Sequence, residues 1–155
     1  MKKVLFISST GGHLNELLQL RRVMKKYDSY LITEKTKSTI DLKDEFGDKV
    51  RFLKYGTKSH LSYIYIYPYD CIKSFIYFIR IRPNVIVTTG AHTCVFMCYL
   101  AKLFGRKVIY IETFANIHSK SMTGKLIYPI ADKFIVQWES MLKLYPKAIY
   151  GGWIF

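Results

Sequence analysis

Acidic residues are scarce in this chain. Its 155 residues contain 11 Asp and Glu against 24 Lys and Arg, which gives a formal net charge of +13. Between residues 49 and 111 the only acid is Asp70. The cations of this stretch are Lys49, Arg51, Lys54, Lys58, Lys73, Arg80, Arg82, Lys102, Arg106 and Lys107. A solvated basic face is one explanation, but so uneven a distribution favours an anionic partner.

Cysteine is also scarce. Cys71, Cys94 and Cys98 form no C-x-x-C pair and no zinc-spaced set with histidine, so the sequence predicts no metal site. An odd number of cysteines without a signal peptide indicates a reducing compartment. The few apolar residues between Lys3 and Ser8 are too short for a secretory signal. We therefore expect a cytoplasmic protein.

Long apolar runs are equally absent. Residues 83–101 carry no fixed charge, but Asn84, Gly90 and His92 fall in the first half of this stretch. A spanning helix needs about 20 predominantly apolar residues. A strand, a turn and a buried helix fit this stretch better than a membrane span.

The amino-terminal strand runs directly into a glycine turn, Thr10-Gly11-Gly12-His13. The turn has neither the G-x-G-x-x-G fingerprint nor the Lys and Ser or Thr of a P-loop, so it predicts no nucleotide cofactor. One interpretation is a tight turn with a solvated histidine. The other is an anion site formed by backbone amides beside a helix N-terminus.

Strand and helix patterns alternate along the rest of the chain. Apolar or β-branched runs predict strands at residues 3–7, 30–33, 50–53, 85–88, 108–111, 134–137 and 148–150. Helical patterns occupy residues 13–26, 69–82, 93–104, 121–128 and 139–145. Strands that are apolar throughout and separated by helices predict a parallel sheet covered on both faces. We expect one Rossmann-like, doubly wound α/β domain over residues 1–155.

Ligands of such sheets bind at the carboxyl ends of the strands. The turns expected there include the glycine turn, Gly90 with His92, and the turn that begins at Glu112. His92 is either a ligand contact or a first-turn helix residue, and Glu112 is either functional or a structural acceptor.

An aromatic segment spans residues 61–82. Its helical pattern predicts a core stripe of Ile72, Phe75, Ile76 and Ile79, with Tyr77, Phe78 and Ile81 on other faces. A helix apolar nearly all round and flanked by cations suits an anionic membrane surface, and burial against a partner is the alternative. The expected membrane-surface residues are Tyr65, Tyr67, Tyr69, Phe75, Phe78, Arg80 and Arg82.

Several short segments, in this order, together resemble one family. They are residues 9–14, 31–36, 82–90, 110–115, 123–125, 131–132, 136–138 and 145–151. The chain resembles the acceptor-side subunit of two-chain GT-B glycosyltransferases. That family includes the anchoring subunit of the dolichol-linked N-acetylglucosaminyltransferase and bacterial subunits of capsule and exopolysaccharide assembly. The chain resembles the bacterial members more closely, since we expect it to lack the amino-terminal membrane anchor of the eukaryotic ones.

The resemblance implies that acceptor binding and donor binding belong to two separate chains. A GT-B enzyme has two Rossmann-like domains, and 155 residues provide one. The chain would be the N-terminal-type, acceptor-side half, at the inner face of the cell membrane. A separate donor-binding subunit would supply the UDP-sugar, and a polyprenyl-diphosphate-linked saccharide would be the acceptor.

The same resemblance assigns provisional roles. His13 or Glu112 would be the general base, and His13 is alternatively a phosphate contact. The backbone amides of Gly11 and Gly12 would hold a diphosphate, with Thr10, Gly90 and His92 nearby. The family often has a basic residue where this chain has Asn116.

The carboxyl-terminal segment is apolar where termini are usually polar. Trp153, Ile154 and Phe155 are expected to bind the partner subunit, and folding back on the chain's own core is the alternative. A stand-alone α/β enzyme for a phosphorylated small molecule is the second function class. Nucleic-acid binding is disfavoured because no recognition helix or RNA-binding signature accompanies the charge.

Overall fold

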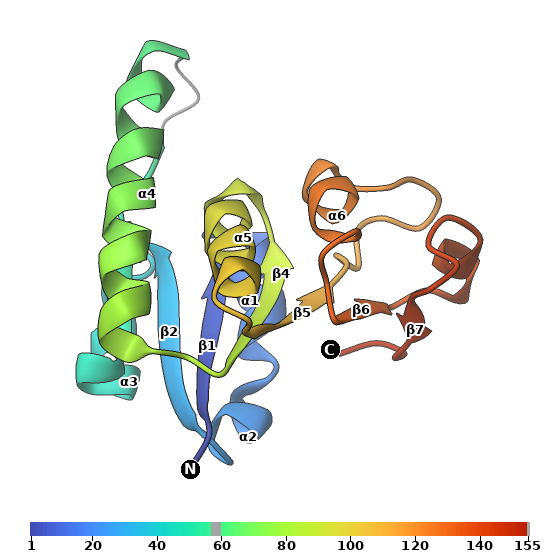
Figure 1. Ribbon diagram of the computed structural model, residues 1–155, viewed down its shortest axis with the longest axis horizontal. Helices are drawn as coiled ribbons and strands as arrows, with labels where there is room; N and C mark the ends of the chain where they lie inside the picture. The colour runs from blue at the N-terminus through green and yellow to red at the C-terminus, as the bar shows by residue number, and fades with distance from the viewer. Residues whose placement is uncertain (57–59, 155) are drawn as a thin grey trace.

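The computed structural model describes the backbone of residues 1–56 and 60–154, and the side chains of all of these except residues 60–63. A parallel sheet of seven strands in the order β3-β2-β1-β4-β5-β6-β7 forms its centre (Figure 1). The strands are β1 (Lys3–Ser8), β2 (Asp28–Glu34), β3 (Val50–Leu53), β4 (Val85–Gly90), β5 (Lys107–Ile111), β6 (Lys133–Val136) and β7 (Ile149–Tyr150). The predicted Rossmann-like parallel sheet is confirmed, with every strand within two residues of its expected bounds.

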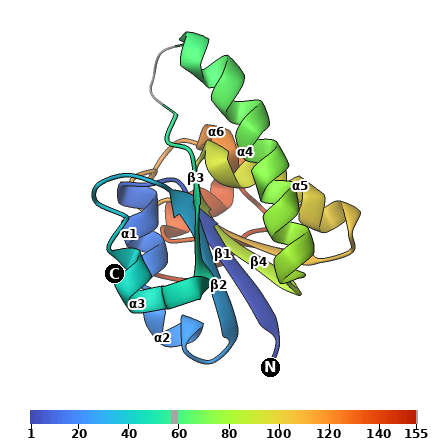
Figure 2. The ribbon, with the colours of Figure 1, turned by 90° about the vertical axis from the view of Figure 1, so that its left-hand side faces the viewer.

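Helices cover both faces of the sheet (Figure 2). On one face lie α1 (Gly12–Leu18), α2 (Arg21–Met24) and α3 (Leu42–Phe46), and on the other α4 (His60–Ile81), α5 (Val95–Leu103) and α6 (Met122–Ile127). Short 3₁₀ helices cover Gly47–Lys49, His92–Cys94 and Glu139–Lys143. The amino-terminal half of α4 projects past the carboxyl ends of the strands in both views (Figures 1 and 2).

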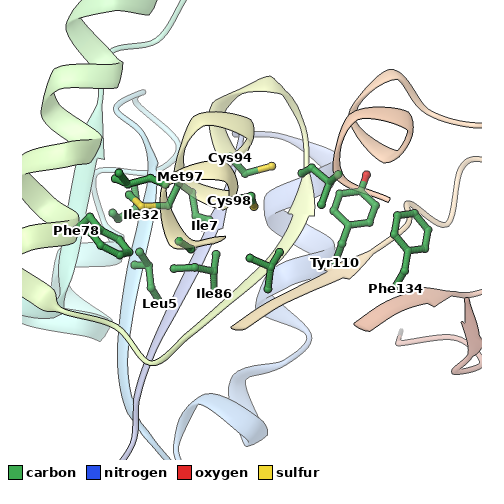
Figure 3. Packing of buried hydrophobic residues seen from close by; sticks show 14 of the residues in the cluster. Leu5, Ile7, Ile32, Phe78, Ile86, Cys94, Met97, Cys98, Tyr110 and Phe134 are labelled. Atoms are coloured by element: carbon green, nitrogen blue, oxygen red, sulfur yellow. The ribbon is translucent and has the colours of Figure 1, made fainter. Parts of the chain in front are cut away.

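Two apolar clusters hold the layers together. The larger lies under α4, α5 and α6 and includes Leu5, Ile86, Met97 and Tyr110 (Figure 3). The smaller lies under α1 to α3. Consecutive residues of β1 alternate between the two clusters because strand side chains point to opposite faces. This explains why the strands are apolar throughout.

The orientation of α4 corrects the sequence analysis. The expected core stripe is wrong, because Ile72, Phe75, Ile76 and Ile79 are all exposed. Phe78 and Ile81 are buried instead, and the Phe78 ring lies 5.3 Å from that of Phe104. Phe78 is therefore a core residue and not a membrane-surface one.

The helical predictions also needed correction elsewhere, and α4 begins at His60 and not at residue 69. The pattern at residues 13–26 forms two short helices, because the chain turns at Gln19 and Leu20 between α1 and α2. Residues 139–145 form a 3₁₀ turn in place of an α-helix, and α3 was not predicted at all. Helix α3 has no fully buried residue, so the apolar pattern that reveals a helix is weak there.

Candidate functional site

The expected turns meet at one edge of the sheet. β1, β4 and β5 are neighbouring parallel strands, so the residues that follow them come together at their carboxyl ends (Figure 1). The Ser9 amide donates to the Gly90 carbonyl at 2.9 Å, which joins the glycine turn to the end of β4. This edge, which we call the His13 edge, therefore carries His13, Gly90 and Glu112, as the sequence predicts.

His13 is held by two reciprocal hydrogen bonds to Thr89. His13 Nδ1 lies 2.8 Å from the Thr89 carbonyl oxygen, and Thr89 Oγ1 donates to the His13 carbonyl at 2.6 Å. A carbonyl only accepts, so Nδ1 carries the proton. In the neutral ring Nε2 is then the unprotonated nitrogen. No partner for Nε2 occurs among the described residues, so this nitrogen can accept a proton from a ligand.

Gly90 allows the imidazole to lie against β4. Its φ is +104°, a conformation that favours glycine. A Cβ at this position would also lie 3.3 Å from both Cε1 and Nδ1 of His13. Gly90 is therefore a packing partner of His13, and its expected role beside a bound phosphate stays a prediction.

The glycine turn faces open space. A Cβ at Gly11 or Gly12 would meet no atom within 4 Å, and Gly11 has a φ of +85°. The Thr10 amide is already used, since it donates to Glu34 Oε2 at 3.2 Å. The amides of Gly11 and Gly12 can be approached closely, whereas Thr10 serves to position the turn.

Glu34, at the end of β2, is a site residue that the sequence analysis missed. Its side chain is 4% exposed and accepts a hydrogen bond from Thr93 Oγ1 at 2.8 Å. Thr93 Oγ1 also lies 2.6 Å from Ser9 Oγ. His92 Nε2 lies 3.6 Å from Glu34 Oε1, so His92 belongs to this second cluster and not to the His13 contact. The only signal in the sequence was an acid at the end of a buried strand.

Glu112 is enclosed by hydrogen-bond donors. It is 1% exposed. Its carboxylate accepts from the Thr113 amide at 3.0 Å, from the hydroxyls of Ser121 and Tyr145 at 3.0 and 2.8 Å, and from Tyr110 at 3.3 Å. Burial and the neighbouring carboxylate raise the pKa of both tyrosines, so their hydroxyls stay protonated. Of the two interpretations of Glu112, these contacts favour the structural acceptor.

Glu16 is a second buried carboxylate that was not predicted. It lies one helical turn after His13 and accepts from Thr113 Oγ1 at 2.8 Å and from the Phe114 amide at 3.1 Å. Burial raises the pKa of Glu16, although these two hydrogen bonds and the proximity of His13 lower it. Glu16 thus ties α1 to the turn after β5.

The carboxyl-terminal segment folds back toward this edge. The Ile154 amide donates to Gln137 Oε1 at 3.2 Å, and its side chain packs on the cluster under α1. The centroid of the Trp153 ring lies 5.3 Å from that of Phe114 and 5.0 Å from that of Trp138, but Trp153 remains 59% exposed. Ile154 therefore follows the fold-back alternative, and Trp153 has a free face. Phe155 lies outside the described residues.

The remaining membrane-surface predictions concern α4. Tyr65, Tyr69 and Phe75 are exposed, and so are Arg80 and Arg82. Tyr67 is half-buried. The exposed apolar residues form a stripe at helical spacing, which we call the α4 stripe. It consists of Ile64, Tyr65, Tyr69, Ile72, Phe75, Ile76 and Ile79.

Comparison with known proteins gives the family. A family model described as "Oligosaccharide biosynthesis protein Alg14 like" matches residues 4–154. The chain belongs to the Alg14-like family. The UDP-N-acetylglucosamine transferase subunit ALG14 of Yarrowia lipolytica is 29% identical over 175 residues, which span 97% of this chain and 80% of the relative. The subunit of the same name from Mus musculus is 30% identical over 177 residues, spanning 97% and 82%.

Solved structures extend the likeness to the fold of this Alg14-like chain. MurG of Acinetobacter baumannii superposes with a TM-score of 0.69 at 13% identity, and UDP-GlcNAc 2-epimerase of Methanocaldococcus jannaschii with 0.72 at 16%. These two matches span 90% and 97% of this chain but only 43% and 45% of the two solved proteins. It corresponds to less than half of each.

In the part of the chain that the structure describes, no three metal-binding side chains gather in one place. The described helices also include none with the length and apolarity needed to cross a bilayer.

Proposed function

We propose that this Alg14-like chain is the acceptor-side subunit of a two-chain glycosyltransferase. A separate subunit would bind the UDP-sugar, and the acceptor would be a polyprenyl-diphosphate-linked saccharide. The single observation that carries the proposal is the family match over residues 4–154, because the curated relatives are themselves named transferase subunits.

The architecture supports a second chain. One Rossmann-like domain supplies one wall of a cleft, and ligands of such sheets lie at the carboxyl edge. The His13 edge is open, since the spaces beside Gly11 and Gly12 are empty. A donor-binding domain facing that edge would close the site.

His13 is the residue best suited to act on the acceptor. Glycosyl transfer requires removal of a proton from the attacking hydroxyl, and imidazole exchanges protons near neutral pH. Because Nδ1 is fixed on the Thr89 carbonyl, Nε2 would accept that proton or contact a phosphate in its protonated form. The free amides of the glycine turn would hold part of the acceptor diphosphate.

The α4 stripe supports placement at a membrane surface. Its seven exposed apolar residues lie beside Lys73, Arg80 and Arg82, and aromatic residues with cations favour the interface of an anionic bilayer. UDP-N-acetylglucosamine is the first donor to test because the relatives are named for it. None of these relatives is named for capsule or exopolysaccharide assembly, so that context stays a prediction.

Reconstitution tests the proposal. The chain, a candidate donor-binding subunit and their mixture are each incubated with labelled UDP-N-acetylglucosamine and a polyprenyl-diphosphate-linked sugar, and labelled lipid is counted. A parallel panel replaces the donor with UDP-galactose or UDP-glucuronic acid. The proposal expects transfer only from the mixture. Transfer by the isolated chain would contradict it and favour a stand-alone enzyme.

A further inference from the structure

A basic groove runs along the edge strand β3, on the side next to α4. One hollow of about 410 Å³ is lined by Lys35, Lys54 and Lys73 with Phe52, Leu53, Tyr55 and Tyr69. A second hollow of about 270 Å³ shares Lys35, Phe52 and Lys73 and adds Lys43 and Arg51. The shared residues make the two hollows one continuous surface, which we call the β3 groove.

Aromatic rings hold two of the lysines in place. Lys54 Nζ lies 4.2 Å from the centroid of the Tyr69 ring. Lys73 Nζ lies 5.4 Å from the Tyr69 centroid and 5.9 Å from that of Tyr77. Such cation–π contacts restrict the ammonium groups and leave their other donors available.

The groove has little negative charge of its own. Among the described residues, Lys35, Lys54 and Lys73 form no ion pair with a carboxylate within 4 Å. Asp48 lines the second hollow, and the nearby Asp70 carboxylate accepts a hydrogen bond from the Lys54 amide at 2.9 Å. Asp70 offsets part of the charge of Lys54 and Lys73, but the five cations of the lining still outnumber Asp48 and Asp70, which suits an anion.

The position of the groove indicates where the anion comes from. Tyr69 belongs both to the groove and to the α4 stripe, so apolar side chains at the bilayer surface would be continuous with the lysines. Lipid phosphates lie at that level of a membrane. The glycine turn follows β1, two strands away from β3 and hence about 10 Å to the side, so the groove is separate from the His13 edge.

We propose that the β3 groove binds the phosphate of an anionic phospholipid headgroup while the α4 stripe lies on the bilayer. Lys54 and Lys73 contact the phosphate from their fixed positions over Tyr69, and Lys35 contacts it from the end of β2. The proposal rests on the membrane placement in the proposed function. It adds a specific lipid contact that does not depend on the transfer reaction.

Vesicle sedimentation with the full chain tests this. Binding is measured on phosphatidylcholine vesicles and on vesicles that also contain phosphatidylglycerol. The triple variant Lys35→Gln, Lys54→Gln, Lys73→Gln is expected to lose on the order of a hundredfold in partitioning onto the anionic vesicles, since each such contact contributes about 1 kcal/mol. Its binding to neutral vesicles is expected to stay unchanged.

A matched variant removes the same charge elsewhere. Lys26→Gln, Lys133→Gln, Lys147→Gln alters three exposed lysines outside the groove and is expected to lose only a few-fold. Equal losses in the two triple variants would overturn the proposal, because net charge alone would then explain them. The triple variant with Arg at the same positions is expected to bind as wild type does, which assigns the loss to the missing charge. Equal urea unfolding of the Gln variant and wild type is the check on folding.

Two further measurements are needed. One distinguishes a lipid headgroup from free phosphate as the ligand, and the other distinguishes failure of the groove proposal from failure of the proposed function. Calorimetry with inorganic phosphate in the absence of vesicles is expected to show only weak binding, and affinity equal to that for anionic vesicles would overturn the headgroup assignment. Transfer to a short-chain, water-soluble acceptor is expected to be equal in wild type and groove variant. If transfer fails altogether but the vesicle difference remains, the proposed function fails and the groove stands.

Discussion

His13 Nδ1 lies 2.8 Å from the carbonyl oxygen of Thr89, and the Thr89 hydroxyl donates back to the His13 carbonyl at 2.6 Å. The two residues are 76 positions apart in the chain. The pair joins the start of α1 to the end of β4 and fixes which ring nitrogen carries the proton. A group positioned in this way is ready to exchange a proton at Nε2 without first reorienting.

Gly90→Ala tests whether β4 positions His13. Both Gly90 and Gly105 have positive φ, at +104° and +65°, so Ala at either is expected to cost about 1 kcal/mol or more in the free energy of unfolding. Only at Gly90 would the new Cβ press on the imidazole, because a Cβ at Gly105 meets no atom within 4 Å. Transfer by the reconstituted complex should fall for Gly90→Ala and stay near wild type for Gly105→Ala. Equal activities would show that His13 tolerates the displacement.

Glu16→Gln is expected to change how stability depends on pH. Burial raises the pKa of Glu16 above its unfolded value, which is near 4.3 for a free glutamate. The folded state therefore binds the proton more tightly, and ionised Glu16 costs stability. That cost is absent below the unfolded pKa and grows as pH rises through the folded pKa. The free energy of unfolding of both proteins is measured with urea from acid to neutral pH. As pH rises, that of wild type should fall relative to that of Glu16→Gln, and parallel dependences on pH would contradict this.

Glu112→Gln should affect stability more than catalysis. The amide would place N–H donors against hydroxyls that already donate, which costs about 1–3 kcal/mol. Tyr145→Phe, which deletes one donor, is the control and should cost less. If Glu112 were the general base, transfer per folded complex would fall about a hundredfold or more. Activity within a few-fold of wild type is expected, and a hundredfold loss would restore the catalytic interpretation.

Removal of residues 153–155 tests the docking of the carboxyl-terminal segment. Trp153 presents a free face beside Phe114 and Trp138, and this aromatic surface is expected to bind the donor-binding subunit. Co-purification with that subunit should weaken for the truncated chain and for Trp153→Ala, but much less for Trp153→Phe. Unchanged association of the truncated chain would assign the segment to the chain's own core.

The strands could be predicted because their apolar residues leave few alternatives. Val4 to Ile7 are buried on both faces, and such runs appear directly in the sequence. The buried face of α4 could not be predicted in this way. Ile72, Ile76, Phe78 and Ile81 surround the helix on all sides, so periodicity does not distinguish the face against the sheet from the exposed one.

The site was predicted where backbone geometry determines it. The glycine turn and Gly90 can be recognised in the sequence because they are glycines that follow predicted strands. The parallel sheet then brings them together. The burial of Glu16, Glu34 and Glu112 was not visible, since each depends on donors that come from distant segments. Tyr145 lies 33 residues from Glu112, for example, and nothing local connects them.

His13→Ala in the reconstituted two-chain complex tests the account most directly. His118→Ala is the matched control, because it removes an exposed histidine from the segment between β5 and α6 and leaves the His13–Thr89 pair unchanged. Initial rates of labelled sugar transfer to the lipid acceptor are compared at equal amounts of purified complex. The account predicts a loss of about a hundredfold or more for His13→Ala, with intact partner binding, and a near-normal rate for His118→Ala. Near-normal transfer by the His13→Ala complex would contradict it.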